Sequence, residues 1–294
     1  MTRLSQTHPG THLGSIQPPF TNPVIPMTLS ARSSVLWIGI LVGAAVLIGL
    51  TNYAQEKHVG HFSAAQADSN GHPSGWEIIR FGDVETETQY QLVERSVKGE
   101  STAVVRAVSD GGAAGLGREM DLNPRQYPML SWQWKVTNVL EEGDARTKDG
   151  DDYPARLYVT FDYAPSNFGL VDRAKYEALQ ALGYDQVPTR ALSYVWASRV
   201  PSDTVLANAF TDWVQMIPVE SGSTRVGTWV GERRNIRVDY RRAFGEAPPP
   251  IDGVALMTDT DNTGEAATAY YGDITARRPA SIQDSQIDWS DLTD

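Results

Sequence analysis

The sequence contains no cysteine, and all five of its histidines lie before residue 73. The lack of cysteine excludes a disulfide framework, a thiol nucleophile and a cysteine-ligated metal. The position of the histidines leaves residues 73–294 without a histidine base or a histidine ligand for a metal. Positive charge is also scarce, because 25 Lys and Arg stand against 36 Asp and Glu. The resulting net charge of −11 argues against nucleic acid as a partner.

The N-terminal region lacks acidic residues until Glu56, and Arg3 and Arg32 carry its only formal side-chain charges. Residues 35–50, VLWIGILVGAAVLIGL, are apolar without interruption. A membrane-spanning helix needs about 20 residues, which the run reaches when it is extended through residue 54. We therefore expect a signal anchor or transmembrane helix over residues 35–54. Because Arg32 lies on its N-terminal side, the rest of the chain is predicted to be exported.

The remaining segments divide the chain by composition. Residues 1–34 are expected to be a cytoplasmic extension, unless synthesis begins at Met27. Residues 55–75 are polar and contain Gly, Ser, His and Ala, which predicts a linker. Four aspartates after Arg278 predict an acidic tail over residues 279–294. One folded domain, residues 76–278, is left between the linker and the tail.

Polar and apolar residues alternate with a period of two through most of this domain, which is typical of β-strands. Such segments are residues 76–81, 88–94, 101–109, 129–136, 155–163, 192–197, 213–219, 228–233, 253–258 and 268–274. Only two helices are expected. Residues 171–183 place Val171, Ala174, Ala178, Leu179 and Leu182 on one stripe before Gly183, and residues 235–245 end at Gly245. Many strands, few helices and no βαβ rhythm predict an all-β, antiparallel β-sandwich of the jelly-roll kind.

Five blocks of the domain are similar to a known family. SWQWKV, GDDYPARLYVTFDY, LSYVWA, ERRNIRVDYRRAFG and IDGVALMTDTDNTGEAATAYYGDI occur in this order. Together they resemble the bacterial family called domain of unknown function 3047, over residues 76–276. A more distant similarity is to galactose-binding-like jelly rolls. The family resemblance implies an exported bacterial protein, held in the inner membrane with its domain in the periplasm, or released into the periplasm if the signal is cleaved.

Acidic residues gather in two of these blocks. Asp259, Asp261 and Asn262 lie in one, and Asp151 and Asp152 lie in the other, close to Arg156. The sequence of residues 259–270 resembles the calcium-binding loop of an EF-hand. We reject an EF-hand because Tyr270 occupies the position of the bidentate glutamate and because the flanking residues predict strands rather than helices. A looser calcium site formed by Asp152, Asp259 and Asp261 remains an alternative, as do a plain turn, ion pairs with Arg156 and a catalytic carboxylate pair.

Whether the two acidic clusters meet depends on the topology. Strict alternation of strand direction puts Asp152 and Asp259 at opposite ends of the sheet, unless residues 235–245 cross it. Aromatic side chains such as Tyr158 and Tyr270, placed beside carboxylates, are typical of carbohydrate sites, because a ring stacks on a sugar face while acids bind hydroxyl groups. Trp132 and Trp134 share one face of their strand and are expected in the core.

The working hypothesis is a protein that binds carbohydrate or another cell-envelope ligand without catalysis. Its candidate ligand-binding residues are Asp151, Asp152, Arg156, Tyr158, Asp259, Asp261, Asn262 and Tyr270. A carboxylate-based glycan hydrolase or lyase is the first alternative. A structural envelope module that binds another protein is the second. No cofactor is expected beyond the calcium alternative.

The export hypothesis predicts the location of the C-terminus. Alkaline phosphatase fused after Asp294 should be active, because the enzyme requires export and Arg32 orients the apolar run with its C-terminal side outward. The measurement is phosphatase activity in intact cells, with a cytoplasmic reporter fused at the same residue as the control. An active cytoplasmic reporter together with an inactive phosphatase would reverse the predicted orientation.

Overall fold

The computed structural model describes residues 56–82, 84–181 and 188–278, all of which belong to the compact unit Leu50–Asp294. The predicted membrane segment 35–54, the N-terminal extension and the acidic tail lie outside these residues. Among the described residues, no helix combines the length and the hydropathy needed to cross a membrane.

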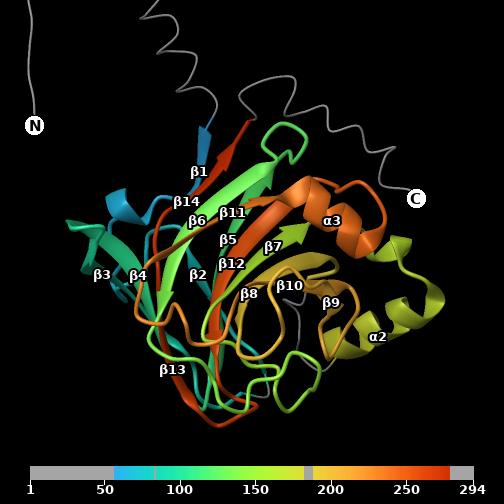
Figure 1. Cartoon of the computed structure of the whole chain (residues 1–294). Helices are drawn as coiled ribbons and strands as arrows, with labels where there is room; N and C mark the ends of the chain where they lie inside the picture. The colour runs from blue at the N-terminus through green and yellow to red at the C-terminus, as the bar shows by residue number, and fades with distance from the viewer. Residues whose placement is uncertain (1–55, 83, 182–187, 279–294) are drawn as a thin grey trace, which may run out of the picture. The chain divides into compact units, whose positions relative to one another are not determined.

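The folded unit is a sandwich of two seven-stranded sheets (Figure 1). The first sheet has the order β1 (Glu56–Gly60), β14 (Ile274–Arg277), β6 (Met129–Val136), β13 (Ala266–Tyr271), β4 (Glu100–Asp110) and β3 (Gln89–Val97), and β11 (Val230–Asn235) also pairs with β6. The second sheet has the order β2 (Glu77–Ile79), β5 (Ala113–Leu122), β12 (Ile251–Asp259), β7 (Arg156–Phe161), β8 (Ala191–Ala197), β10 (Val214–Ser221) and β9 (Leu206–Ala207). The predicted β-sandwich is therefore confirmed.

Aromatic side chains from the middle of each sheet fill the space between them. Trp132 and Trp134 of β6 are buried, as predicted, with their ring centroids 5.6 Å apart in an edge-on arrangement. Across the core, the ring centroid of Trp132 lies 5.1 Å from that of Tyr194, and the ring centroid of Trp134 lies 6.1 Å from that of Trp196. Large rings from facing strands thus supply much of the apolar area that holds the two sheets together.

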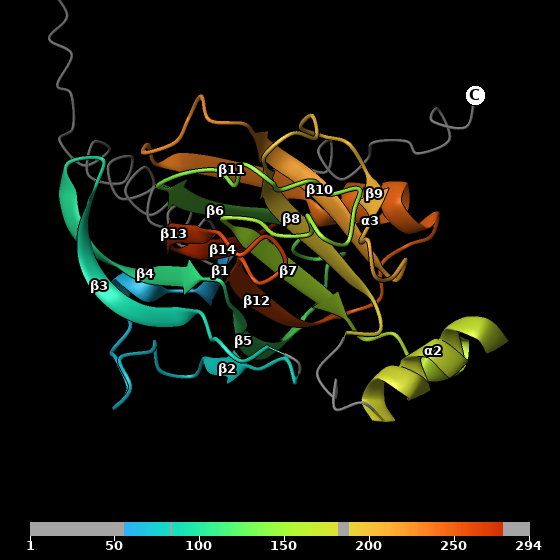
Figure 2. The ribbon, with the colours of Figure 1, turned by 90° about the horizontal axis from the view of Figure 1, so that it is seen from below.

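Two helices accompany the strands, with short 3-10 turns at Phe62–Ala64 (η1) and Pro165–Asn167 (η2). Helix α3 (Ile236–Phe244) was predicted: the Asn235 side chain caps its N-terminus, and Gly245 ends it at a φ of +75°. Helix α2 (Leu170–Ala181) was also predicted, but Val171, Ala174 and Ala178 of its expected apolar stripe are exposed, and Tyr176 instead contacts Trp213 at a ring-centroid distance of 6.3 Å. Val171 is 69% exposed, and Figure 2 shows α2 standing apart from the strands. Gly183, its predicted cap, lies outside the described residues.

Strand β5 has no counterpart in the sequence prediction, because its glycines interrupt the alternation of polar and apolar residues. The glycines are required by the neighbouring strand β2. A Cβ atom on Gly117 would lie 2.5 Å from Cδ1 of Ile79, and one on Gly115 would lie 3.2 Å from Cβ of Ile79. Ile79 therefore packs over β5 only because these two positions lack side chains.

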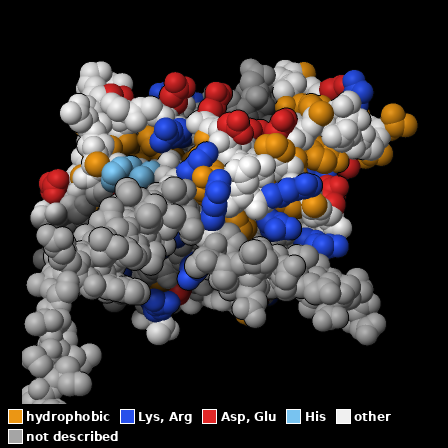
Figure 3. Space-filling view, turned by 90° about the horizontal axis from the view of Figure 1, so that it is seen from above, with side chains coloured by type: hydrophobic (Ala, Val, Ile, Leu, Met, Phe, Trp, Pro, Cys, Tyr) orange, Lys and Arg blue, Asp and Glu red, His pale blue; other side chains and the backbone are white. Residues whose placement is uncertain are grey.

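The predicted linker over residues 55–75 is wrong for its first part. Strand β1 pairs with β14, and the Phe62 side chain is completely buried with its ring centroid 5.0 Å from that of Trp76. Three histidines, His58, His61 and His72, consequently belong to the folded unit. His58 and His61 stack at a centroid distance of 4.0 Å, and Figure 3 shows histidine side chains on the surface beside Lys and Arg. Composition concealed this segment, because a few buried apolar residues anchor an otherwise polar stretch.

The contribution of residues 56–64 to the core can be measured. Phe62→Ala should lower the free energy of unfolding by about 3–5 kcal/mol, because it leaves a cavity against Trp76. His61→Ala, at an exposed neighbouring position, should change it by less than about 0.5 kcal/mol. Urea denaturation followed by tryptophan fluorescence measures both. If both substitutions changed the free energy of unfolding by the same small amount, residues 56–64 would be a linker after all.

Candidate functional site

The outward face of the second sheet is hollow, because small residues occupy its centre. Side chains alternate between the two faces of a strand, so Leu116 of β5 and Leu256 of β12 enter the core while their neighbours face outward. The outward positions along the middle of the face are Gly115, Gly117, Gly253 and Ala255. Two hollows follow, with volumes of about 670 Å³ and about 1180 Å³. Both are lined by Ile79, Thr160 and Pro188, so together they form one groove along the strands.

The smaller hollow has an apolar floor and a polar end. Its apolar lining includes Ile79, Phe81, Val84, Tyr158, Phe210 and Met257. Its polar lining comprises Lys148, Asp151, Arg156, Asn208, Asp259, Asp261 and Asn262, together with Thr160 and Thr211. Phe210 is 56% exposed, and the Lys148 ammonium lies 5.1 Å from its ring centroid. An exposed aromatic ring at the rim and buried polar groups within are the usual composition of a ligand site.

Arg156 and Asp259 form the centre of the polar end, and both are almost fully buried. Arg156 Nε donates to Asp259 Oδ1 at 2.8 Å, and its Nη2 atom contacts Asp259 Oδ2 and the carbonyl oxygen of Asp151. Nη1 donates to the Tyr158 hydroxyl at 3.1 Å. The guanidinium also lies over the ring of Tyr153, 4.1 Å from its centroid. This two-pronged pairing is the strong form of the arginine–carboxylate interaction, and it leaves the arginine few free donors.

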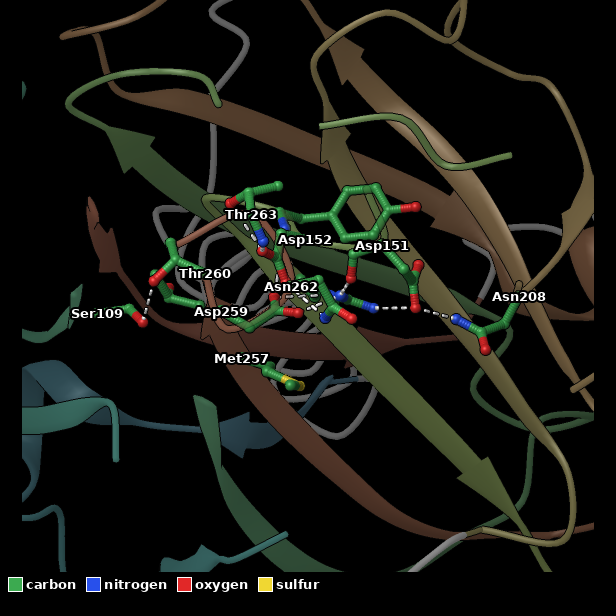
Figure 4. Close-up of polar contacts among 12 residues, drawn as sticks. Ser109, Asp151, Asp152, Asn208, Met257, Asp259, Thr260, Asn262 and Thr263 are labelled. Carbon is green, nitrogen blue, oxygen red and sulfur yellow. Dashed lines mark hydrogen bonds and ion pairs between the residues drawn. The ribbon is translucent and has the colours of Figure 1, made fainter. Parts of the chain in front are cut away.

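Asp152 closes the acidic turn that follows β12. Its carboxylate accepts hydrogen bonds from Asn262 Nδ2 at 3.0 Å, from the Thr263 backbone N–H at 2.7 Å and from the Thr263 hydroxyl at 2.8 Å (Figure 4). Gly264 completes the turn with a φ of +69°, a conformation that side chains disfavour. The stretch that resembled a calcium loop is thus a turn, and it is held by the carboxylate of Asp152 from the segment that precedes β7.

The two acidic clusters meet because β12 lies antiparallel to β7, with Met257 opposite Arg156. The count of alternating strands in the sequence put them at opposite ends because it missed the short strand β9, which lies between β8 and β10 in the chain. With β9 included, β10 is antiparallel to β9 and parallel to β8, and alternation leads to the observed direction of β12. The structure therefore brings together Asp151, Asp152, Arg156, Tyr158, Asp259, Asp261 and Asn262. Tyr270 is not among them, because it lies on β13 of the other sheet.

Asp151 carries an unused acceptor at the wall of the groove. Its Oδ2 atom accepts a hydrogen bond from Asn208 Nδ2 at 2.6 Å and lies 3.7 Å from Arg156 Nη1. Its Oδ1 atom is buried and has no partner within the described residues. Burial raises the pKa of Asp151, and the charge of Arg156 opposes this change. A buried acceptor without a donor is costly, and this one is enclosed by protein atoms, so Asp151 shapes the wall of the groove through its contacts with Asn208 and Arg156.

The carboxylates fit a calcium ion poorly. One oxygen from each of Asp152, Asp259 and Asp261 lies within 4.8 Å of the others. However, both oxygens of Asp152 accept from Asn262 or Thr263, and both oxygens of Asp259 accept from Arg156 or Tyr153. Calcium takes 6–8 oxygen ligands, and a cation would have to displace these donors. Burial, followed by the charge of Asp152, raises the pKa of Asp261, while burial opposed by Arg156 raises that of Asp259.

A second pair of carboxyl groups was missed by the sequence analysis. Glu220 of β10 and Glu232 of β11 lie together, and Arg225 Nη1 donates to Glu220 Oε1 at 2.5 Å. Burial, then the charge and hydrogen bond of Glu220, raise the pKa of Glu232 to about 8. Asn208 and Phe210 were also missed, since they lie in a polar loop without periodicity.

Comparisons with known proteins identify a family and several solved structures. Residues 74–275 match the family described as "Protein of unknown function (DUF3047)". No curated protein sequence matches the chain. Among solved structures, the family 11 carbohydrate-binding module of the cellulosomal cellulase Lic26A-Cel5E of Clostridium thermocellum is similar at 10% identity and a TM-score of 0.36, over 76% of this chain and 95% of that one.

Two further structures are similar in chain path. The family 30 carbohydrate-binding module of the cellulosomal cellulase Cel9D-Cel44B of Clostridium thermocellum has 10% identity and a TM-score of 0.34, over 77% of this chain and 99% of that one. A β-1,2-glucanase from Parabacteroides distasonis has 13% identity and a TM-score of 0.37, over 77% of this chain and 26% of that one.

The charge balance of the site predicts the effect of removing its arginine. Arg156→Met should lower the free energy of unfolding by about 3–5 kcal/mol, because Asp259 is left buried and unpaired. Arg146→Met, at an exposed arginine, should change it by less than about 0.5 kcal/mol. Urea denaturation with and without millimolar calcium measures both effects. Calcium should stabilise neither protein, whereas a bound ion at a hundredfold excess over its Kd would add about 2.7 kcal/mol and would show that calcium neutralises the cluster.

Proposed function

The chain belongs to the DUF3047 family of proteins of unknown function, and we propose that its sandwich binds a carbohydrate chain in the groove of the second sheet. The observation that carries this proposal is the pairing of an apolar floor with buried polar groups at one end. Sugars present an apolar ring face and a rim of hydroxyl groups, so they need both kinds of contact at once.

Particular side chains match the two needs. Met257 and Tyr158 supply apolar surface at the floor, and Phe210 supplies an exposed ring at the rim. Asp261 and Asn262 line the polar end, are exposed, and offer hydrogen-bonding groups to sugar hydroxyl groups. Arg156 holds Asp259 and Tyr158 through its hydrogen bonds. The site is therefore ordered before a ligand arrives, which lowers the entropic cost of binding.

The length of the groove favours a chain over a single sugar. Its lining runs along β12 from Asp252 to Asp259, a distance of about 23 Å at roughly 3.3 Å per residue. The far end is acidic, with Glu77, Glu119 and Asp252. A neutral or amino-substituted glycan suits this end better than an acidic one, because like charges repel.

The alternatives have weaker support. A carboxylate-based glycan hydrolase or lyase would need accessible acids, whereas Asp152 and Asp259 are each 1% exposed and their oxygens are engaged. A protein-binding envelope module would use a broad apolar surface, whereas the lining of the groove is partly polar. Calcium at Asp152, Asp259 and Asp261 would order the turn without changing the proposed ligand. We further propose that binding takes place outside the cytoplasm, on the strength of the apolar run over residues 35–54.

Filling the groove should abolish binding. Ala255→Trp places an indole in the middle of the hollow face and should weaken binding of any retained glycan at least tenfold, which corresponds to about 1.4 kcal/mol. Ala178→Trp, at an exposed position of α2, is the matched control and should bind as the wild type does. A panel of soluble neutral polysaccharides, screened by affinity electrophoresis and followed by calorimetry, measures this.

Two outcomes would contradict the proposal. One is the absence of retention for every glycan in the panel by a folded wild-type protein. The other is an Ala255→Trp variant that melts as the wild type does and binds with unchanged affinity. If the wild type binds and Ala255→Trp does not, Tyr158→Phe locates the ligand relative to the polar end, because it keeps the ring but loses the hydroxyl group that accepts from Arg156 Nη1.

A further inference from the structure

The outward face of the first sheet differs from the groove face in its charge. Alternation along β3, β4, β13, β6 and β11 directs Tyr90, Val105, Ala269, Trp134 and Val230 into the core and their neighbours outward. Between the strand ends, the outward residues of these strands include Arg95, Arg106, Lys135 and Arg233. They include no Asp or Glu, although the net charge of the chain is −11.

Three of these cations surround one aromatic side chain. Tyr270 of β13 lies directly between Arg106 of β4 and Lys135 of β6 in the strand register. The Lys135 Nζ atom is 5.0 Å from the ring centroid of Tyr270, and the Arg95 guanidinium carbon is 5.2 Å from the same centroid. We call Arg95, Arg106, Lys135 and Tyr270 the cationic cluster.

Trp229 lies beside the cationic cluster and contacts both Tyr270 and Lys135. Its ring centroid lies 6.4 Å from that of Tyr270, and Lys135 Nζ lies 5.6 Å from it. The indole N–H donates to the Ser96 carbonyl oxygen at 3.1 Å, which ties the residue to the end of β3. The cation–π contacts of Lys135 with both rings restrain its long side chain, so its charge is held above the sheet.

The charges of the cluster are not compensated from within the described part of the chain. There, Arg95, Arg106 and Lys135 form no ion pair with a carboxylate, and the Nε atom of Arg106 is buried without an acceptor. Although burial by itself raises the pKa of Tyr270, the neighbouring Arg95 and Arg106 hold that pKa below its ordinary value. Three like charges around one ring repel one another unless an anion lies among them.

We propose that the cationic cluster is a second binding site, which takes the carboxylate or sulfate group of an acidic polysaccharide. The guanidinium groups of Arg95 and Arg106 offer paired donors, and Lys135 offers a point charge. A neutral sugar ring would be a poor ligand here, because Arg95 and Lys135 already cover the ring of Tyr270. The site lies on the sheet opposite the groove and is independent of the proposed function.

Binding of polyanions to the full-length chain tests this site. The probes are polygalacturonate for carboxylate, dextran sulfate for sulfate and dextran as the uncharged polymer, titrated by calorimetry at low ionic strength. Each of Arg95→Gln and Lys135→Gln should weaken binding of the preferred polyanion about tenfold, while dextran should not bind this face. Added salt should weaken binding as well, because the cluster is partly exposed.

The control variant removes the same charge elsewhere. Lys175→Gln on α2 changes the net charge equally but should leave the affinity within about twofold of the wild type. An equal loss in Lys175→Gln and Lys135→Gln would show nonspecific attraction and overturn the proposal, as would the absence of binding to both polyanions. Ala255→Trp in the groove should not affect polyanion binding, so failure of one site is distinguishable from failure of the other.

Discussion

The buried ion pair between Arg156 and Asp259 is the interaction on which the candidate site depends. It joins the first residue of β7 to the last residue of β12, and the same guanidinium contacts the carbonyl oxygen of Asp151 and the hydroxyl of Tyr158. A buried charge without its partner costs several kcal/mol, so neither residue can be lost singly without destabilising the end of the sheet. The same ion pair therefore stabilises the fold and fixes the position of the residues that form the wall of the groove.

The groove arises where side chains are missing. Gly115 and Gly117 allow Ile79 to pack over β5, and Gly253 and Ala255 continue the low strip on β12. The space between the two sheets is filled by large aromatic side chains, those of Trp132, Trp134, Tyr194 and Trp196. Large side chains pack the interior of the sandwich, while small residues on one outer face leave room for the groove.

The two outer faces of the sandwich are chemically unlike. The face of the second sheet is hollow, apolar in its floor and acidic at its far end. The face of the first sheet carries arginine and lysine around Tyr270 and Trp229, with no acidic residue between the strand ends. A chain with an overall negative charge thus carries a small group of cations together on the first sheet, and the two faces suit ligands of opposite character.

Local patterns in the sequence were sufficient for much of the fold. The period-two segments predicted β2, β3, β4, β6, β7, β8, β10, β11, β12 and β13, and Asn235 with Gly245 marked the ends of α3. Strands β1 and β5 were not predictable in this way. Val59 and Phe62 are single anchors in a polar stretch, and the glycines of β5 only make sense once Ile79 is packed against them.

The sequence by itself determined the sandwich class, the core tryptophans and the residues that carry charge, because these follow from composition and alternation along the chain. Only the tertiary structure decided which of those residues meet. The antiparallel pairing of β12 with β7 placed Asp152 beside Asp259, and the position of β13 in the other sheet separated both from Tyr270. Strand direction and sheet membership are set by contacts between residues far apart in the chain, and no local pattern records them.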